Sequence, residues 1–118
     1  MLRGPKAGTC ERMVGTEAIE EAHEISGYLF LTKRHVFDEV GGFDSNYTPC
    51  FYEEIDYSFA VRALGYKCLV VPGVDVAHRR MHGVSAKRVA VEYFGKSEMT
   101  DAVTQRNHDY FVRKWRLG

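Results

Sequence analysis

The stretch from Gly41 to Gly73, GGFDSNYTPCFYEEIDYSFAVRALGYKCLVVPG, constrains the fold more than any other part of the chain. Residues 53–64 carry apolar side chains at helical spacing, and acids fill the first turn, which matches the helix dipole. Gly65 ends this helix, and residues 66–71 form an apolar, strand-sized run that a Pro-Gly pair stops. A helix followed at once by a strand predicts a mixed α/β domain.

The segments on either side extend this pattern. The apolar run 25–32 predicts a buried strand, and Gly27 in its interior suggests close approach by a ligand or another backbone. Helices are further predicted over residues 17–24, 33–40, 86–94 and 99–115, and a short strand is predicted over residues 74–77. The expected fold class is therefore α/β, as an α+β arrangement of a few mixed strands packed with helices and a long C-terminal helical segment. A flexible N-terminal arm is expected over residues 1–16.

Composition excludes several classes of protein. The 118 residues predict one domain, and 16 basic residues balance 16 acidic ones, which argues against a nucleic-acid binder that depends on bulk charge. The three cysteines are far apart and form no CxxC pair, so a reducing, cytoplasmic setting fits best. No apolar run approaches the roughly 20 residues that cross a bilayer, so no transmembrane segment is expected.

An acid cluster stands at the start of the central helix. Glu53, Glu54 and Asp56 follow directly behind Phe51 and Tyr52. One interpretation is that they are helix N-terminal charges, each stabilising the helix by about 0.3–1 kcal/mol. The other interpretation is a catalytic base or a cation site held at a helix N-terminus. The cluster by itself leaves both open.

The order of motifs resembles the C-terminal half of the nucleotide-sugar-dependent family 2 glycosyltransferases, which have the GT-A fold. The matching pieces are Gly27 in its strand, Arg34-His35-Val36-Phe37, Gly41-Gly42-Phe43-Asp44, Glu53-Glu54-Ile55-Asp56, Arg62-Ala63-Leu64-Gly65-Tyr66, Pro72 and His78. The resemblance covers residues 25–80, and NHDYFVRKW at 107–115 is similar to the closing helix of some members. Each piece alone is weak, but seven pieces in order are fairly specific.

The resemblance implies an inverting sugar transfer from a nucleotide-sugar to a hydroxyl acceptor, with a carboxylate that takes the hydroxyl proton. Glu54 stands where the family usually has an aspartate, so it is the expected general base, although Glu53 or Asp56 could do this work instead. Otherwise Glu53 and Asp56 are expected to position the acceptor and the helix start. Gly27 is expected to line the acceptor side of the cleft, and Tyr52 is either a core residue or a wall on which a sugar stacks.

His78, Arg79 and Arg80 are the residues that the resemblance places near the departing diphosphate. His78 is expected to ligate a divalent cation, Mn²⁺ or Mg²⁺, or to touch the diphosphate, and imidazole suits Mn²⁺ better than Mg²⁺. Arg79 and Arg80 could bind the phosphate oxygens, because guanidinium groups pair well with them. Plain solvated charge is an equally good interpretation of the two arginines.

The family's donor-binding half has no counterpart in the sequence. No Asp-x-Asp motif is present, and the residues before 25 are too few for a βαβ nucleotide-binding unit, which takes about 30 residues. Residues 17–118 are therefore expected to be an acceptor-side half-domain of a longer enzyme, inactive alone, with no bound cation of its own. Exposed surfaces predict a homodimer. The alternative is a non-catalytic binding or scaffold module with a degenerate glycosyltransferase fold. The expected location is the cytoplasm or the cytoplasmic face of a membrane.

Overall fold

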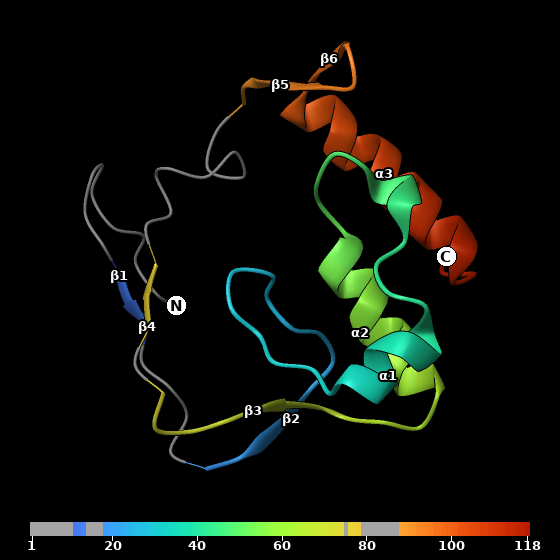
Figure 1. The fold of residues 1–118 in the computed structure, drawn as a ribbon. Helices are drawn as coiled ribbons and strands as arrows, with labels where there is room; N and C mark the ends of the chain where they lie inside the picture. Colours follow the sequence, from blue (N-terminus) through green and yellow to red (C-terminus); the bar gives the residue numbers. More distant parts are fainter. Residues whose placement is uncertain (1–10, 14–17, 75, 79–87) are drawn as a thin grey trace.

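The computed structural model describes residues 11–13, 18–74, 76–78 and 88–118. In this part the chain forms α-helices, one short 3₁₀-helix (η1) and strands that pair two by two (Figure 1). The elements in chain order are β1 (Glu11–Met13), β2 (Glu20–Ala22), α1 (Arg34–Val40), η1 (Ser45–Tyr47), α2 (Glu53–Ala63), β3 (Cys68–Val70), β4 (Val76–His78), β5 (Ala90–Tyr93), β6 (Lys96–Met99) and α3 (Thr100–Lys114). The predicted mixed α/β class is confirmed.

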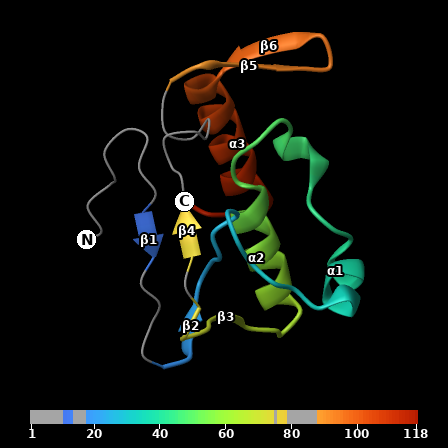
Figure 2. The ribbon, with the colours of Figure 1, turned by 60° about the vertical axis from the view of Figure 1, so that its left-hand side comes forward.

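The strands form small antiparallel pairs. β1 pairs with β4, β2 with β3, and β5 with β6. The β5–β6 hairpin stands at the N-terminal end of α3, apart from the other two pairs (Figure 2). Among the described residues no larger sheet unites these pairs, so the helices supply most of the core.

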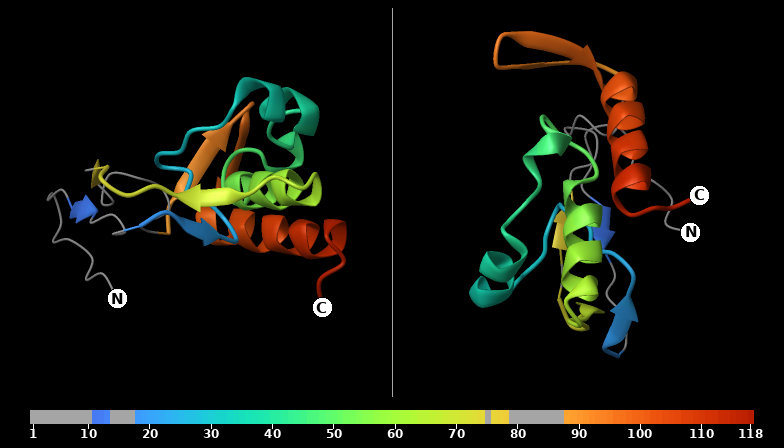
Figure 3. Two further views of the ribbon diagram at one scale, coloured as in Figure 1. Left: turned by 90° about the horizontal axis from the view of Figure 1, so that it is seen from below. Right: turned by 90° about the vertical axis from the view of Figure 1, so that its right-hand side faces the viewer.

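The core lies on both sides of α2. On one side α2 packs against α1 and β3, and the buried cluster there is Val36, Tyr57, Val61 and Cys68. Fully burying an apolar side chain of this size contributes about 1.5–3 kcal/mol. On the other side the Phe59 ring meets the Phe111 ring of α3, with 4.9 Å between centroids. The helices α2 and α3 therefore lie side by side (Figure 3), and the middle of α2 is packed on two sides.

Five of the predicted elements are confirmed within a few residues, namely α1, α2, β3, β4 and α3. Gly41 ends α1 in the left-handed region with φ of 89°, and its N–H donates to the Phe37 carbonyl. Gly65 follows α2 with the same φ of 89°. Glycine adopts this conformation without a steric cost, which is why both helix ends could be read from the sequence.

The prediction of a buried strand over residues 25–32 is wrong. This segment is irregular and lies along α2, where the Ile25 N–H donates to Ser58 Oγ at 3.0 Å and the hydroxyls of Thr32 and Tyr57 are 2.7 Å apart. Leu31 is 98% exposed. A β-prone run becomes a strand only when another strand pairs with it, and here the Ile25 N–H bonds a side chain of α2 instead.

Two helix predictions are also wrong. Within residues 17–24 the described part contains β2, because Glu20 to Ala22 pair with β3. Within residues 86–94 the described part contains β5, which forms a hairpin with β6. The two turn residues, Phe94 and Gly95, have φ of 45° and 74°, and two consecutive positive φ angles suit a tight two-residue hairpin turn. The arm predicted over residues 1–16 lies outside the described residues except for β1.

Candidate functional site

Glu54 lies in the first turn of α2 with its side chain partly buried. Its Oε2 atom and that of Glu53 are buried, and neither has a hydrogen-bond partner among the described residues. Gly27 lies against the same side chain, because a Cβ atom at Gly27 would stand 3.4 Å from Cδ of Glu54, an ordinary contact distance. The structure therefore brings together Gly27 and Glu54, which the sequence analysis singled out separately.

The environment of Glu54 favours its protonated form. Burial raises the pKa of Glu54, its own backbone N–H lowers it, and the carboxylates of Glu53 and Glu24 raise it further. The net pKa lies above the ordinary value of 4.5. Removing water from a carboxylate without giving it a partner makes the charged form costly, which is the physical cause of the shift.

A hollow of about 590 Å³ lies beside Glu54, between the start of α2 and the first half of α3. Its lining residues are Phe51, Tyr52, Glu54, Ile55, Arg88, Thr100, Asp101, Thr104 and Gln105. The lining mixes two aromatic rings with hydroxyl, amide and charged groups. Such a surface offers both a stacking face and hydrogen-bond partners to a polar ligand.

Tyr52 packs against α3 and also borders the hollow, and its role as a wall on which a sugar stacks stays a prediction. Its ring packs against α3, with centroids 5.9 Å from His108 and 5.6 Å from Phe111, and it also lines the hollow. Tyr52 caps α2 with φ of 75°, in the left-handed region, and Phe51 before it has the same φ. For residues other than glycine this conformation costs on the order of 1–3 kcal/mol each, so other contacts must hold it.

Asp56 is engaged by side chains outside the hollow. It is 3% exposed, and Oδ1 accepts from the Tyr47 hydroxyl at 2.9 Å and from Trp115 Nε1 at 2.8 Å. Lys114 Nζ donates to Asp56 Oδ2 at 2.9 Å. These three donors come from η1, from α3 and from its C-terminal cap, so Asp56 ties the beginning of α2 to the end of the chain.

Asp44 shares the Lys114 ammonium group with Asp56. Lys114 Nζ donates to Asp44 Oδ2 at 2.8 Å, and the Tyr110 hydroxyl donates to the same oxygen at 2.9 Å. Burial raises the pKa of Asp44, but hydrogen bonds from Lys114, from Asn46 and from Tyr110 outweigh this and hold the pKa well below its ordinary value. The aspartate of the GGFD motif therefore stays charged and anchors α3.

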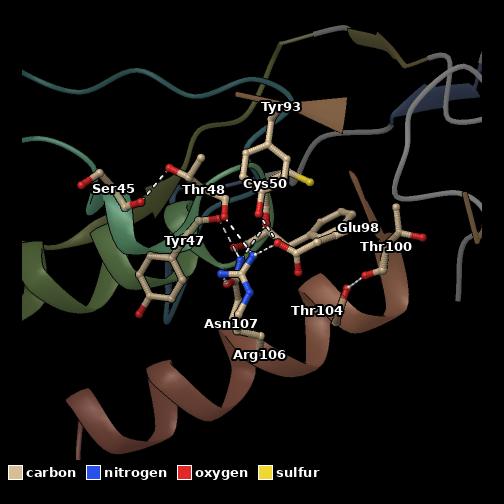
Figure 4. A network of polar contacts seen from close by, with 11 residues as sticks. Ser45, Tyr47, Thr48, Cys50, Tyr93, Glu98, Thr100, Thr104, Arg106 and Asn107 are labelled. Carbon is tan, nitrogen blue, oxygen red and sulfur yellow. Dashed lines mark hydrogen bonds and ion pairs between the residues drawn. The ribbon is translucent and has the colours of Figure 1, made fainter. Parts of the chain in front are cut away.

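Two neighbouring residues of α3 hold the loop that leads into the acid cluster (Figure 4). Asn107 Nδ2 donates to the carbonyls of Tyr47 at 2.8 Å, Cys50 at 2.8 Å and Phe51 at 3.0 Å. Arg106 Nη2 donates to the carbonyl of Thr48 at 3.0 Å. The backbone just before Glu53 is thus fixed from a helix that comes much later in the sequence.

The residues predicted near the diphosphate are described only in part. His78 ends β4, where its backbone is opposite Glu11, and its side chain lies outside the described residues, as do Arg79 and Arg80. In the described part of the chain no three His, Cys, Asp or Glu residues converge as metal ligands. The structure thus leaves the predicted convergence of Glu54 and His78 as a prediction.

The side of the hollow formed by Arg88 and α3 was not predicted from the sequence. The polar residues of this side are Arg88, Thr100, Asp101, Thr104 and Gln105. The α3 members are spaced i, i+1, i+4 and i+5, which places them on one helix face. A polar face on an otherwise amphipathic helix is the feature that could have indicated them, although solvent contact explains such a face equally well.

Replacement of Glu54 by glutamine should stabilise the fold near neutral pH by roughly 0.5–2 kcal/mol. A carboxyl whose pKa is raised on folding contributes its stability below the ordinary pKa and loses it as pH rises through the folded-state pKa. The gain of Glu54→Gln over the native chain should therefore be small at pH 4 and larger at pH 8, measured by urea unfolding. Glu92→Gln, at an exposed position of β5, is the control with the same charge change. A gain that is equal at both pH values contradicts the prediction.

Part of the chain is similar to two curated proteins, both named N-acetylglucosaminyl-diphospho-decaprenol L-rhamnosyltransferase, from the CDC 1551 / Oshkosh and ATCC 25618 / H37Rv strains of Mycobacterium tuberculosis. In each case the alignment spans 58 residues, of which 33% are identical. The aligned segment covers 49% of this chain and 19% of the relative. The chain therefore spans about a fifth of the length of the relatives it matches. No family model matches the chain, and no solved structure does. The similarity supports sugar transfer as the class of activity in coarse terms.

The described helices are also informative about membranes. None of them is both long enough and apolar enough to span a bilayer.

Proposed function

We propose that this chain supplies the acceptor site and the general base of an inverting glycosyltransferase, which moves a sugar from a nucleotide-sugar donor to a hydroxyl acceptor. The single observation that carries the proposal is the state of Glu54. Its side chain lines the hollow, one carboxylate oxygen is buried without a partner in the described part, and its pKa is raised. A base works best when its pKa lies close to the working pH.

In the proposed step the acceptor hydroxyl gives its proton to the Glu54 carboxylate while its oxygen forms a bond to the anomeric carbon. The bond from that carbon to the diphosphate breaks, and its electron pair leaves with the nucleotide diphosphate. Attack opposite the leaving group inverts the configuration of the carbon. The carboxylate must come within about 2.6–3.2 Å of the hydroxyl oxygen, and the extra methylene of glutamate over aspartate lengthens its reach into the hollow.

The neighbours of Glu54 have supporting roles in this proposal. Tyr52 offers a ring on which the acceptor sugar stacks, and Gly27 lies against the Glu54 side chain outside the lining of the hollow. Glu53 does not line the hollow, so in this proposal it acts on the acceptor only through the start of α2. Asp56 fixes the start of α2 through Lys114 and so acts on the acceptor indirectly.

The donor side of the reaction rests on residues outside the described part. A divalent cation, Mn²⁺ or Mg²⁺, would stabilise the charge of the departing diphosphate when bound in the full-length protein. His78 would be its ligand, and Arg79 and Arg80 would bind phosphate oxygens. The described residues do not by themselves provide a set of three ligands.

Titration with an acceptor sugar tests the proposed site directly. The relatives' name includes an N-acetylglucosaminyl group carried on a lipid diphosphate, so methyl N-acetylglucosaminide is a suitable soluble probe. We expect saturable changes in the amide NMR signals of Tyr52, Glu54 and Thr104, and weaker binding by Tyr52→Ala. Ala102→Ser, at an exposed position on α3, is the control. Saturating probe that leaves the signals around the hollow unmoved, together with a full-length protein that transfers no sugar, would favour the scaffold alternative.

The exposed apolar surface supports the proposal of a homodimer. Tyr28, Leu29 and Leu31 are exposed, and so are Leu69 and Val70 on β3. Such surface tends to be covered by a second molecule. Light scattering at high protein concentration should give the mass of a dimer, and Leu31→Asp should shift it towards the monomer. A native chain that stays monomeric at high concentration contradicts the proposal.

The proposed place of reaction is the cytoplasm, at the cytoplasmic face of a membrane if the acceptor is lipid-linked. Cys50 and Cys68 are both free thiols, which fits a reducing compartment. Fractionation of cells that express the full-length protein tests this placement.

A further inference from the structure

The loop of residues 47–52 accepts hydrogen bonds from α3 at four of its carbonyls. The carbonyls of Tyr47, Cys50 and Phe51 all accept from Asn107, and the carbonyl of Thr48 accepts from Arg106. A buried carbonyl without a partner is costly, so a loop without regular structure needs such donors. Two adjacent residues of one helix supply them here (Figure 4).

Asn107 occupies a position where an apolar side chain is expected. It lies four residues after Val103 and four before Phe111, both buried, so the three share one face of α3. Asn107 is 0% exposed. An amide group at the centre of this buried stripe is costly unless its hydrogen bonds are made, and the carbonyls of the loop make them. Arg106 Nη1 donates to its Oδ1 at 3.0 Å, which fixes the orientation of the amide.

The loop that Asn107 holds leads directly into the acid cluster. Phe51 and Tyr52 both have φ of 75°, a conformation that persists in non-glycine residues only when surrounding contacts enforce it. The hydrogen bond from Asn107 to the Phe51 carbonyl holds the peptide group between these two residues. Glu53 and Glu54 follow without an intervening residue, so the path of the backbone through Phe51 and Tyr52 sets where the Glu54 side chain begins.

We propose that Asn107, oriented by Arg106, is a positioning residue that presents the Glu54 side chain to the hollow. This inference rests on the proposed function of Glu54 as the base and goes beyond it, because it assigns the placement of that base to α3. Neither residue touches the reacting groups in this proposal. Asn107 acts through the carbonyls of the loop.

The test compares two truncations on one face of α3. Asn107→Ala removes the loop bonds, whereas Val103→Ala, one turn earlier and equally buried, creates a cavity without touching them. Both variants should be less stable than the native chain. Only Asn107→Ala should lower the pKa of Glu54 towards 4.5, measured by carbon-13 NMR of the carboxyl group, because a relaxed loop lets water reach it.

The other charged groups near Glu54 are unchanged in both variants. They are Glu53 on the same helix, Glu24 in the segment before Gly27, and the Arg88–Asp101 pair at the hollow. A difference in the Glu54 pKa between Asn107→Ala and Val103→Ala therefore comes from the loop and not from these charged groups. In the full-length enzyme Asn107→Ala should reduce kcat by about 10²-fold with KM little changed, because misplacement of a catalytic group by about 1 Å has an effect of this size.

Arg106→Ala is the second variant if Asn107→Ala fails to fold. Its side chain is 41% exposed, so its removal breaks the ion pair with Glu98 but leaves the buried stripe of α3 in place. It should shift the Glu54 pKa in the same direction by a smaller amount. The inference is overturned if the folded Asn107 and Arg106 variants leave the Glu54 pKa at its native value, or if Val103→Ala moves it equally. The NMR measurement of the Glu54 pKa requires no sugar transfer. It therefore tests the role of Asn107 even if the proposed function is wrong.

Discussion

Replacing Glu54 by glutamine should reduce sugar transfer by the full-length protein by about 10²–10⁴-fold, the usual contribution of a general base. Glutamine keeps the shape of the side chain and its place beside Gly27 but cannot take the proton of the acceptor hydroxyl. Transfer is measured as release of nucleotide diphosphate from the donor at saturating acceptor. The loss should appear in kcat, because binding of the acceptor by Tyr52 and α3 is retained.

The neighbouring acids provide the comparison for this experiment. Glu53→Gln should have a smaller effect than Glu54→Gln, since Glu53 does not line the hollow. Transfer by Glu54→Gln at the native rate would remove Glu54 as the base. A large loss in Glu53→Gln together with a native Glu54→Gln would move that role one residue back along α2.

Replacing Asp56 by alanine should lower the free energy of unfolding by at most about 3–5 kcal/mol, the effect of breaking a fully buried ion pair, because Asp56 is buried and Lys114 only partly so. The change leaves the Lys114 ammonium group with only Asp44, and it leaves the Tyr47 hydroxyl and Trp115 Nε1 without their acceptor. A domain of this kind is stable by about 5–15 kcal/mol, so the change removes a large share. Urea unfolding of the isolated chain gives the measurement.

The control for Asp56 is another aspartate in an ion pair at the surface. Asp38 pairs with Arg34 on α1 at 2.9 Å, and both side chains are largely exposed. Asp38→Ala should therefore change the unfolding free energy by at most about 1 kcal/mol. If Asp56→Ala costs no more than Asp38→Ala, the buried cluster does not hold α3 in the way described.

The parts of the fold that could be predicted are those that local chemistry specifies. Gly41 and Gly65 end two helices because each adopts positive φ, and the acids at the start of α2 match its dipole. Residues 25–32 could not be placed, because whether an apolar, β-prone run becomes a strand depends on a distant pairing partner. The hairpin β5–β6 was missed because alternation in AVEY also fits helical spacing over so short a run.

In the candidate site, too, some residues could be predicted from the sequence and others could not. Glu54, Tyr52 and Gly27 were indicated by the order of motifs, and the structure places them close together. The contacts of Asp56 and Asn107 could not be foreseen, since each joins parts of the chain more than 50 residues apart. The burial of polar groups such as Asp56 and Asn107 depends on partners that no local pattern reveals.

The distance in sequence between the acid loop and its anchors has a consequence for biosynthesis. Asn107 lies 56 to 60 residues after the carbonyls it binds. While the ribosome is still making α3, the emerged part of the chain contains Glu54 but not the side chain that shapes the backbone before it. The carboxylate therefore reaches its final setting only after α3 has left the ribosome, so a nascent chain that ends before α3 would carry the acid without the backbone geometry that Asn107 enforces.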